Sequence, residues 1–327
     1  MRHFISAVIY YTLNVLLFPA LLAGYVIYVG KWFAGRKTGV SATAQAPLIA
    51  RWLQHELGTR PDEPATRLLM VVPGISHLGL RLVTSPTLVG HRASGFVPRT
   101  LRYPFEGNIT MQNEGGARQT FFDGVADRYL AGISQFVILG AGFDTRAFRL
   151  KGVSKETRVH YFKIDTLQTQ AVKRQMLEKA GIDATGITFV SADFEAENWL
   201  IQLIDAGFDL KRPALFIMEG VIVYLDREAA EDTLRKIAST ATGSIVAFDY
   251  FTSEVLESKA SYMRTVRASL KAGGEPLKFG IDSTPPSSER LAEFLQSCGL
   301  SLAEQRTLGE ETSGKRAWGG FAIATVK

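Results

Sequence analysis

Four short apolar segments of the chain are each followed by residues that could contact a nucleoside. Gly140 and Gly142 follow the first segment, and the carboxylates Asp165, Asp193 and Glu219 follow the three later ones. Glycine has no side chain, so its backbone can approach a ligand closely. A carboxylate can accept hydrogen bonds from ribose hydroxyls or stabilise a nearby cation. The order of these residues predicts a nucleoside-binding edge at the ends of consecutive strands.

The residues after the glycine pair favour a nucleoside without phosphate groups. A nicotinamide-dinucleotide fingerprint needs a third small residue where this chain has Thr145. Asp144 would add negative charge where a pyrophosphate would lie. We therefore expect S-adenosyl-L-methionine as the cofactor and a methyltransferase as the enzyme class. Two alternatives are an NAD(P)-dependent Rossmann-type oxidoreductase and a catalytically silent methyltransferase fold that serves as a membrane partner.

Each carboxylate has an expected ligand and a purely structural alternative. Asp165 lies 25 residues after Gly140 and could accept both ribose hydroxyls, or only begin a turn. Asp193 and Phe194 could contact the adenine amino group and ring, although acidic–aromatic pairs are common. Glu219 could stabilise the sulfonium or the methionyl ammonium, or it could pair with an arginine.

Strand-like and helix-like segments alternate along most of the chain, which predicts an α/β fold with a mostly parallel sheet covered on both faces. No helix is expected between the last two strands, so they should form a hairpin and make one strand antiparallel. The expected strands are 135–139, 159–164, 188–191, 213–218, 244–250, 300–307 and 318–326, and the expected helices are 121–130, 169–180, 227–240 and 288–298.

Three segments, 117–123 (ARQTFFD), 135–146 (QFVILGAGFDTR) and 219–225 (EGVIVYL), resemble the leucine carboxyl methyltransferase-like family. The resemblance covers about residues 115–327 and points to a bacterial branch of small-molecule O-methyltransferases. It implies a Rossmann-like class I methyltransferase fold with a seven-stranded sheet. The region before residue 115 does not match, so the substrate cannot be carried over, and a protein C-terminus as acceptor is not supported.

The resemblance also implies a role for individual residues. Its cofactor contacts fall on Arg118 for the cofactor carboxylate, Gly140, Ala141 and Gly142 for the methionyl part, Asp165 for the ribose, Asp193 and Phe194 for the adenine, and Glu219 for the methionyl amine. Asp144 and Arg146 would fix the loop or form a structural ion pair, and Arg146 could also reach the substrate. The chain departs from the family after Asp165, where it reads Thr-Leu-Gln and family members often have a proline.

The N-terminus predicts a membrane anchor helix over residues 1–34. From Phe4 to Gly30 there is no charged side chain, and Asn14 is the only strongly polar residue. As a helix this run would reach about 40 Å, enough to span a bilayer core with tilt, and Pro19 would kink it. A cleaved signal peptide or a buried core helix is the alternative. Lys31, Arg36 and Lys37 outnumber the basic residues before the run, which places the rest of the chain in the cytoplasm.

Residues 35–112 are expected to form a helical cap or substrate region, and residues 113–327 the methyltransferase domain. Apolar spacing predicts a helix over 46–57. The apolar stretch 68–89 is interrupted by Pro73, Gly74 and Pro86 and is a poor second span. We expect it to pack over a substrate pocket or to lie in the membrane interface.

The composition of the chain limits the classes of partner that we expect. The net charge of +5 comes without a dense Lys/Arg block, so no nucleic-acid partner is expected. Cys298 is the single cysteine, which excludes an internal disulfide and a multi-cysteine zinc site, and no metal is predicted. The expected partners are the membrane, through the N-terminal helix, and an apolar small-molecule or lipid-like methyl acceptor. The oligomeric state is not predicted.

Methyl transfer from a sulfonium is an in-line displacement that depends mainly on positioning and desolvation. A carboxylate acceptor needs no general base, whereas a hydroxyl acceptor does. The candidates for such a base are His77 within the apolar stretch 68–89 and His91 just after it, together with Tyr224 and Asp249 near the ends of the fourth and fifth strands. A structural role is the alternative for each of the four.

Overall fold

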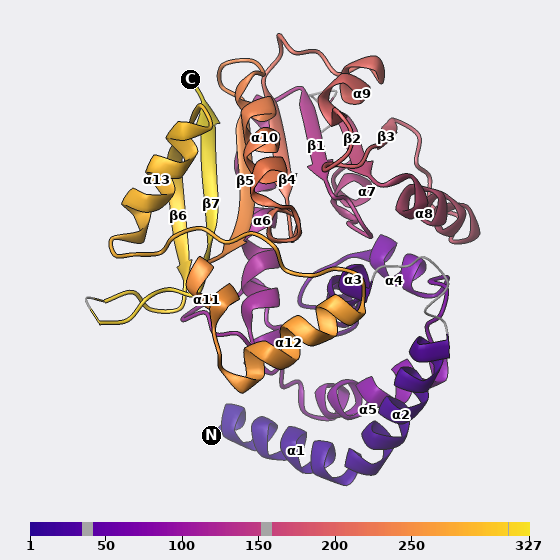
Figure 1. The fold of residues 1–327 in the computed structure, drawn as a ribbon. Coiled ribbons are helices and arrows are strands. Elements are labelled where there is room, and N and C mark those ends of the chain that lie inside the picture. The colour runs from indigo at the N-terminus through magenta and orange to yellow at the C-terminus, as the bar shows by residue number, and fades with distance from the viewer. Residues whose placement is uncertain (35–41, 152–158, 313) are drawn as a thin grey trace. The chain divides into compact units, whose positions relative to one another are not determined.

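The computed structural model describes residues 1–34, 42–151, 159–312 and 314–327. The chain divides into two compact units, shown in Figure 1: an N-terminal unit of residues 1–105 and 172–183, and a sheet unit of residues 106–171 and 184–327. Arg36 and Lys37, on which the predicted membrane orientation partly rests, lie outside the described residues. The boundaries predicted after residues 34 and 112 remain predictions.

Within the described residues, the sheet has seven strands in the order β3-β2-β1-β4-β5-β7-β6. Neighbouring strands are parallel from β3 to β5, and β7 runs antiparallel to both β5 and β6. The predicted mostly parallel sheet with one antiparallel strand is confirmed, and the chain has the class I methyltransferase fold. The strands are β1 Gln135–Leu139, β2 His160–Asp165, β3 Ile187–Ser191, β4 Ala214–Met218, β5 Ile245–Phe251, β6 Leu300–Leu308 and β7 Gly319–Val326.

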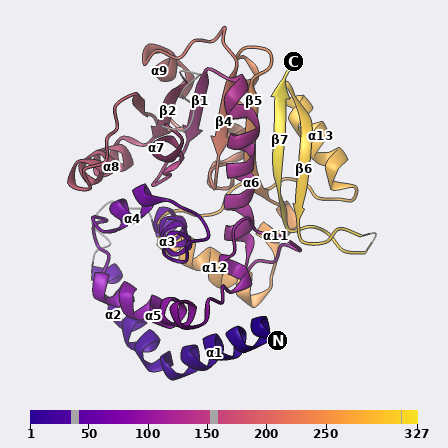
Figure 2. The same ribbon diagram turned by 180° about the vertical axis from the view of Figure 1, so that it is seen from behind.

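Helices cover both faces of the sheet. In Figure 1 helices α10 (Arg227–Ala238) and α13 (Ser287–Ser297) lie in front of it, and Figure 2 shows α6 (Glu114–Tyr129) on the opposite face. Every residue of β1 and β4 is buried, because side chains alternate between two covered faces. The other helices after residue 129 are η3 Leu130–Gly132, α7 Arg146–Leu150, α8 Leu167–Lys179, α9 Trp199–Asp205, η4 Ile222–Tyr224, α11 Ser253–Glu257 and α12 Ser261–Ala272.

Helix α6 begins at Glu114, earlier than the helix predicted from Phe121. The prediction began at the first apolar residues, where Phe121 now stacks on Phe321 of β7 at 4.9 Å between ring centroids. The earlier, polar part of the helix is stabilised by an ion pair of 2.7 Å between Glu114 and Arg118, one turn apart. This extension brings Arg118 to the edge of the sheet.

The N-terminal unit is helical, and two helices take the place of the single anchor helix. They are α1 (Arg2–Leu16) and α2 (Phe18–Ala34), separated at Leu17. Pro19 lies in the first turn of α2, where its missing N–H is tolerated but cannot continue the hydrogen bonds of α1. No single described helix is long and apolar enough to cross a membrane, and α1 and α2 meet that test only as a pair bent by 56°. The remaining helices before residue 106 are α3 Ala42–Glu56, α4 Glu63–Leu69, α5 His77–Ser94 and η2 Arg99–Leu101.

Glycines allow α1 and α2 to pack closely on α5. A Cβ atom on Gly24 of α2 would lie 2.6 Å from Leu82 Cβ and 2.6 Å from Val83 N. On α5, a Cβ on Gly79 would lie 2.8 Å from the backbone of α2, and one on Gly90 2.8 Å from Tyr10 of α1. Helix α2 is therefore in backbone contact with α5, whereas α1 packs the side chain of Tyr10 on Gly90, and both contacts require glycine on at least one side.

Pro86 does not interrupt α5, contrary to the predicted break in the stretch 68–89. Proline cannot donate to the carbonyl four residues earlier, and here Ser85 Oγ donates to that carbonyl of Leu82 at 2.8 Å. Asn14 Nδ2 of α1 donates to the Pro86 carbonyl at 3.2 Å. The only strongly polar residue of the N-terminal run thus joins α1 to α5 where α5 contains its proline.

Replacing Gly24 with alanine should loosen α2 from α5, because the added methyl would overlap backbone and Cβ atoms of α5. Gly30→Ala is the matched control, since nothing lies within 4 Å of its Cβ position. Hydrogen exchange of residues 1–34 should become at least tenfold faster in Gly24→Ala and stay unchanged in Gly30→Ala. Equal exchange in the two variants would contradict the packing.

Candidate active site

Strand register places the predicted residues in one row along the carboxyl edge of the sheet. Leu139 of β1 is paired with Ile164 of β2 and with Met218 of β4, and Met218 is paired with Phe248 of β5. The residues that follow these partners therefore lie at the same level: Gly140, Asp165, Glu219 and Asp249. With neighbouring strands about 4.8 Å apart, a row from β3 to β5 measures about 19 Å, which suits an elongated ligand.

The glycine loop is shaped by packing and by β2. Gly140 has φ +59°, and a Cβ there would lie 2.4 Å from Val221 Cγ2. Gly142 N donates to Asp165 Oδ2 at 2.6 Å, and Ala141 N donates to the Ile164 carbonyl at 2.9 Å. Glycine at 140 is thus needed for its backbone angle and for the close approach of Val221.

Arg146 connects this loop to two other elements and is fully buried. Its guanidinium donates to Asp123 of α6 at 2.7 Å, to Asp144 at 2.5 Å and to Glu219 at 2.5 Å. Burial acts to lower the pKa of Arg146, but the three carboxylates outweigh it and hold that pKa well above the usual value. Asp144 and Arg146 therefore form the structural ion pair considered as an alternative above.

Two consequences follow for the predicted contacts. Glu219 pairs with Arg146, which was the structural alternative to a ligand contact, and it remains partly exposed at the strand end. Direct contact of Asp144 or Arg146 with cofactor or substrate remains a prediction. Their position makes them positioning residues for the glycine loop.

Arg118 reaches the same edge from α6. Its Nε lies 2.7 Å from Glu114 and 3.1 Å from Asp249, and its Nη1 lies 3.4 Å from the Cβ position of Gly220. Burial lowers the pKa of Arg118, but Glu114, Asp249 and Glu219 raise it by more, so the guanidinium stays charged. A charged fork at this place suits the cofactor carboxylate that the resemblance assigns to it.

Asp249 is held by two donors. Its carboxylate accepts a 2.6 Å hydrogen bond from Gly220 N and lies 3.1 Å from Arg118. Burial raises its pKa to about 6, although Arg118 and the Gly220 N–H oppose the shift. As a general base Asp249 would have to give up these contacts, so the geometry fits a positioning role better.

The residues assigned to ribose and adenine are adjacent at the ends of β2 and β3. Asp165 accepts hydrogen bonds from Gly142 N and Thr166 N, and its carbonyl accepts one from Ala192 N at 3.0 Å. Asp193 is exposed, and its Oδ1 accepts from Glu195 N at 2.9 Å. The half-buried ring of Phe194 packs edge-on against Trp199 with centroids 6.2 Å apart.

The other three candidate bases do not directly follow a strand of the sheet. Tyr224 is half-buried in η4 and packs against the hydrophobic core. His77 and His91 belong to the N-terminal unit, at opposite ends of α5. Fourteen residues of helix separate their Cα atoms by about 21 Å, so the two cannot serve one acceptor oxygen. A base role for any of them remains a prediction.

Sequence reasoning missed several residues of the site. Glu114, Asp123 and Lys163 complete the charge cluster, and Lys163 Nζ donates to the Asp144 carbonyl at 2.6 Å. Gln119 is buried, and within the described part of the chain neither polar atom of its amide has a hydrogen-bond partner. The position of Asp123 in the ARQTFFD segment was the available signal, whereas nothing in the sequence marked Lys163. The described residues hold no group of three or more His, Cys, Asp or Glu side chains suited to a metal ion.

Comparison with known proteins identifies the family. The leucine carboxyl methyltransferase model matches residues 105–238. A protein of Mycolicibacterium smegmatis described as an S-adenosyl-L-methionine-dependent methyltransferase is 31% identical over 221 residues, which are 67% of this chain and 68% of the relative. The chain belongs to this methyltransferase family. S-adenosyl-L-methionine is accordingly its cofactor.

Two further proteins are similar to this chain. A Mycolicibacterium paratuberculosis relative is 35% identical over 188 residues, and the match covers 56% of this chain and 60% of the relative. A solved methyltransferase structure from Thermobifida fusca has a TM-score of 0.49 at 15% identity and covers 90% of this chain and 97% of that one.

The charges of this methyltransferase's row fit the cofactor. S-adenosyl-L-methionine carries a sulfonium, an ammonium and a carboxylate, and so has one net positive charge. The cluster has one more carboxylate than cations, namely Glu114, Asp123, Asp144, Glu219 and Asp249 against Arg118, Arg146, Arg149 and Lys163. The order of the strands β3, β2, β1 and β4 also matches the order in which the resemblance assigns the adenine, the ribose, the methionyl part and the methionyl amine.

Gly140→Ala should weaken binding of S-adenosylhomocysteine at least tenfold, because the methyl would force Val221 and the loop apart. Gly186→Ala is the matched control. Gly186 also has a positive φ, of +77°, so a side chain costs about 1–2 kcal/mol at either glycine. At Gly186, however, nothing lies within 4 Å of the Cβ position. Calorimetric titration should give an affinity within twofold of the wild type for Gly186→Ala. Equal affinities for the two variants would contradict the role assigned to Gly140.

Proposed function

We propose that the protein is an O-methyltransferase that acts at a membrane surface and methylates a carboxylate on an apolar small molecule or lipid-like acid. The observation that carries the choice of a carboxylate is the state of Asp249, a buried acid of the row, which is held by Arg118 and by the Gly220 N–H. An ionised carboxylate acceptor needs no base. The description of the matching family model also names a carboxyl methyltransferase.

In the proposed reaction the residues of the chain bind the cofactor and the acceptor and orient them relative to each other. The cofactor supplies an electrophilic methyl group on sulfur. Arg118 would hold the cofactor carboxylate, Glu219 the ammonium and Asp165 the ribose, while the glycine loop would fix the sulfur. Holding the acceptor oxygen in line with the methyl in a site that excludes water accounts for most of the rate in such a displacement.

Membrane association is supported by the outer surface of α1 and α2. Phe4, Val15, Leu16 and Val26 are each between 68% and 73% exposed although they are large and apolar. Asn14, the one strongly polar side chain of the run, is used for contact with α5. A continuous exposed apolar face is typical of helices that lie in the membrane interface. Flotation of the full chain with phospholipid vesicles tests this part, and a chain that stays in the soluble fraction would overturn it.

The reaction is tested with methyl-labelled cofactor and three acceptors that share one chain: dodecanoic acid, dodecanol and dodecylamine. We expect label only in the acid, as a methyl ester that mild base hydrolyses to volatile methanol. Arg118→Met should raise the KM for the cofactor at least tenfold, because the cofactor carboxylate loses its partner. Arg128→Met is the matched control on the same helix, since Arg128 pairs with Glu304 at the surface.

Two results would overturn the proposal. A base-stable labelled ether or amine would contradict the carboxylate acceptor. Cofactor binding without turnover on any of these acceptors would favour the catalytically silent fold.

A further inference from the structure

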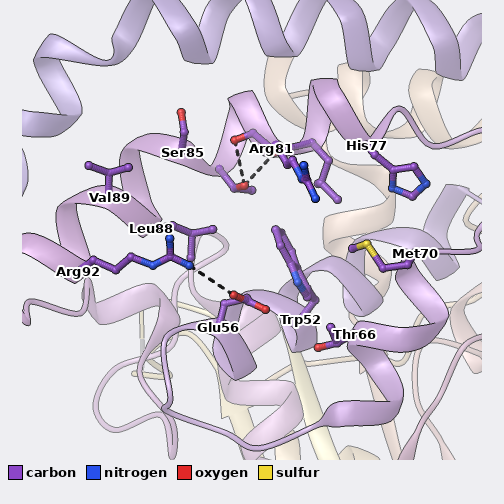
Figure 3. Close-up of a pocket in the computed structure, with 12 residues that line it drawn as sticks. Trp52, Glu56, Thr66, Met70, His77, Arg81, Ser85, Leu88, Val89 and Arg92 are labelled. Atoms are coloured by element: carbon purple, nitrogen blue, oxygen red, sulfur yellow. Dashed lines mark hydrogen bonds and ion pairs between the residues drawn. The ribbon is translucent and has the colours of Figure 1, made fainter.

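The two faces of helix α5 make different contacts. Gly79, Pro86 and Gly90 lie on the face that contacts α1 and α2. On its other face, His77, Arg81, Thr84, Leu88 and Arg92 recur at helical spacing and line a cavity of about 420 Å³. Trp52 and Glu56 of α3 form the opposite wall, as Figure 3 shows. The cavity lies wholly within the N-terminal unit and has the size of a small-molecule site.

The middle of the cavity is apolar. The indole of Trp52 and the side chain of Leu80 are buried, and Leu88 is half-buried. Met70 and Val89, which also line the cavity, are both 41% exposed despite being apolar. Thr84, the polar residue among them, has its hydroxyl bonded to the Leu80 carbonyl at 2.8 Å. An apolar ligand would cover surface that otherwise faces water, and this is favourable.

The two ends of the cavity are polar but differ in charge. At one end Arg92 lies 3.9 Å from Glu56, so the two charges offset each other. The other end has His77, and Arg81, one turn further along α5, extends toward Trp52 in Figure 3. No carboxylate among the described residues lies within ion-pair distance of Arg81. Eleven residues of helix separate Arg81 from Arg92, or about 16 Å, which is the length of a medium alkyl chain.

We propose that this cavity binds a single-chain amphiphile with an anionic carboxylate head. The head would pair with Arg81, whose planar guanidinium matches a carboxylate in a two-point contact. The alkyl chain would lie along Trp52 and Leu88 and end near the Arg92–Glu56 pair. The inference rests on the N-terminal unit alone and not on methyl transfer, so each proposal can fail without the other.

The test is equilibrium binding of radiolabelled dodecanoate to the full chain, held in zwitterionic nanodiscs without cofactor. We expect a saturable site in this cavity, counted apart from any binding of the same acid at the methyl-acceptor site. Arg81→Gln should weaken it at least tenfold, because the head loses its charged partner, and Leu88→Asn should weaken it by a similar factor, because a polar group enters the path of the chain. Arg81 is exposed, so this variant should keep the wild-type melting temperature.

Matched controls separate the cavity from partitioning into lipid. Arg99→Gln removes an exposed arginine of the same unit, and Leu78→Asn changes a leucine of α5 that is 61% exposed, and neither residue lines the cavity. Both controls should bind dodecanoate within twofold of the wild type, and unlabelled dodecanol should compete at least tenfold less well than dodecanoate. The proposal is overturned by binding that does not saturate, by dodecanol competing as well as dodecanoate, or by Arg81→Gln binding as the wild type does.

Discussion

The buried guanidinium of Arg146 is the interaction on which the candidate active site depends. Its three carboxylate partners come from different parts of the chain: Asp123 from α6, Asp144 from the loop after β1, and Glu219 from the end of β4. Removing one partner of a buried ion pair leaves an uncompensated charge and costs about 3–5 kcal/mol. The helix, the glycine loop and the strand end are therefore held together as one charged unit.

Strand register supplies the rest of the geometry. Gly140, Asp165, Glu219 and Asp249 lie at one level because β1, β2, β4 and β5 are parallel and their registers agree. Asp165 fixes the glycine loop through the Gly142 N–H, so the acid assigned to the ribose also positions the loop assigned to the methionyl part. The contacts that stabilise this part of the fold therefore also set the shape of the predicted ligand site.

The sequence predicted those structural features that depend on the local pattern of apolar and polar residues. Apolar runs between glycines and acids were enough to predict the strands and the antiparallel hairpin, both of which the structure confirms. It did not resolve whether Glu219 meets a ligand or an arginine, because a carboxylate suits both and the outcome depends on Arg146 of α7, 73 residues earlier in the chain, reaching the end of β4. Pro86 was expected to break a helix, and the Ser85 hydroxyl and Asn14 amide that compensate for it are visible only in three dimensions. The separation of His77 from His91 likewise follows from their sharing one continuous helix.

The most direct test of this account is the affinity of Arg146→Lys for S-adenosylhomocysteine, measured by calorimetry beside Arg149→Lys. Lysine keeps the charge but cannot reach three carboxylates with a planar fork. Arg149, whose side chain is 23% exposed, forms its ion pair among the described residues with Asp123 only. The account predicts at least tenfold weaker binding for Arg146→Lys and a change within twofold for Arg149→Lys. Wild-type affinity in Arg146→Lys would show that the glycine loop does not depend on this guanidinium.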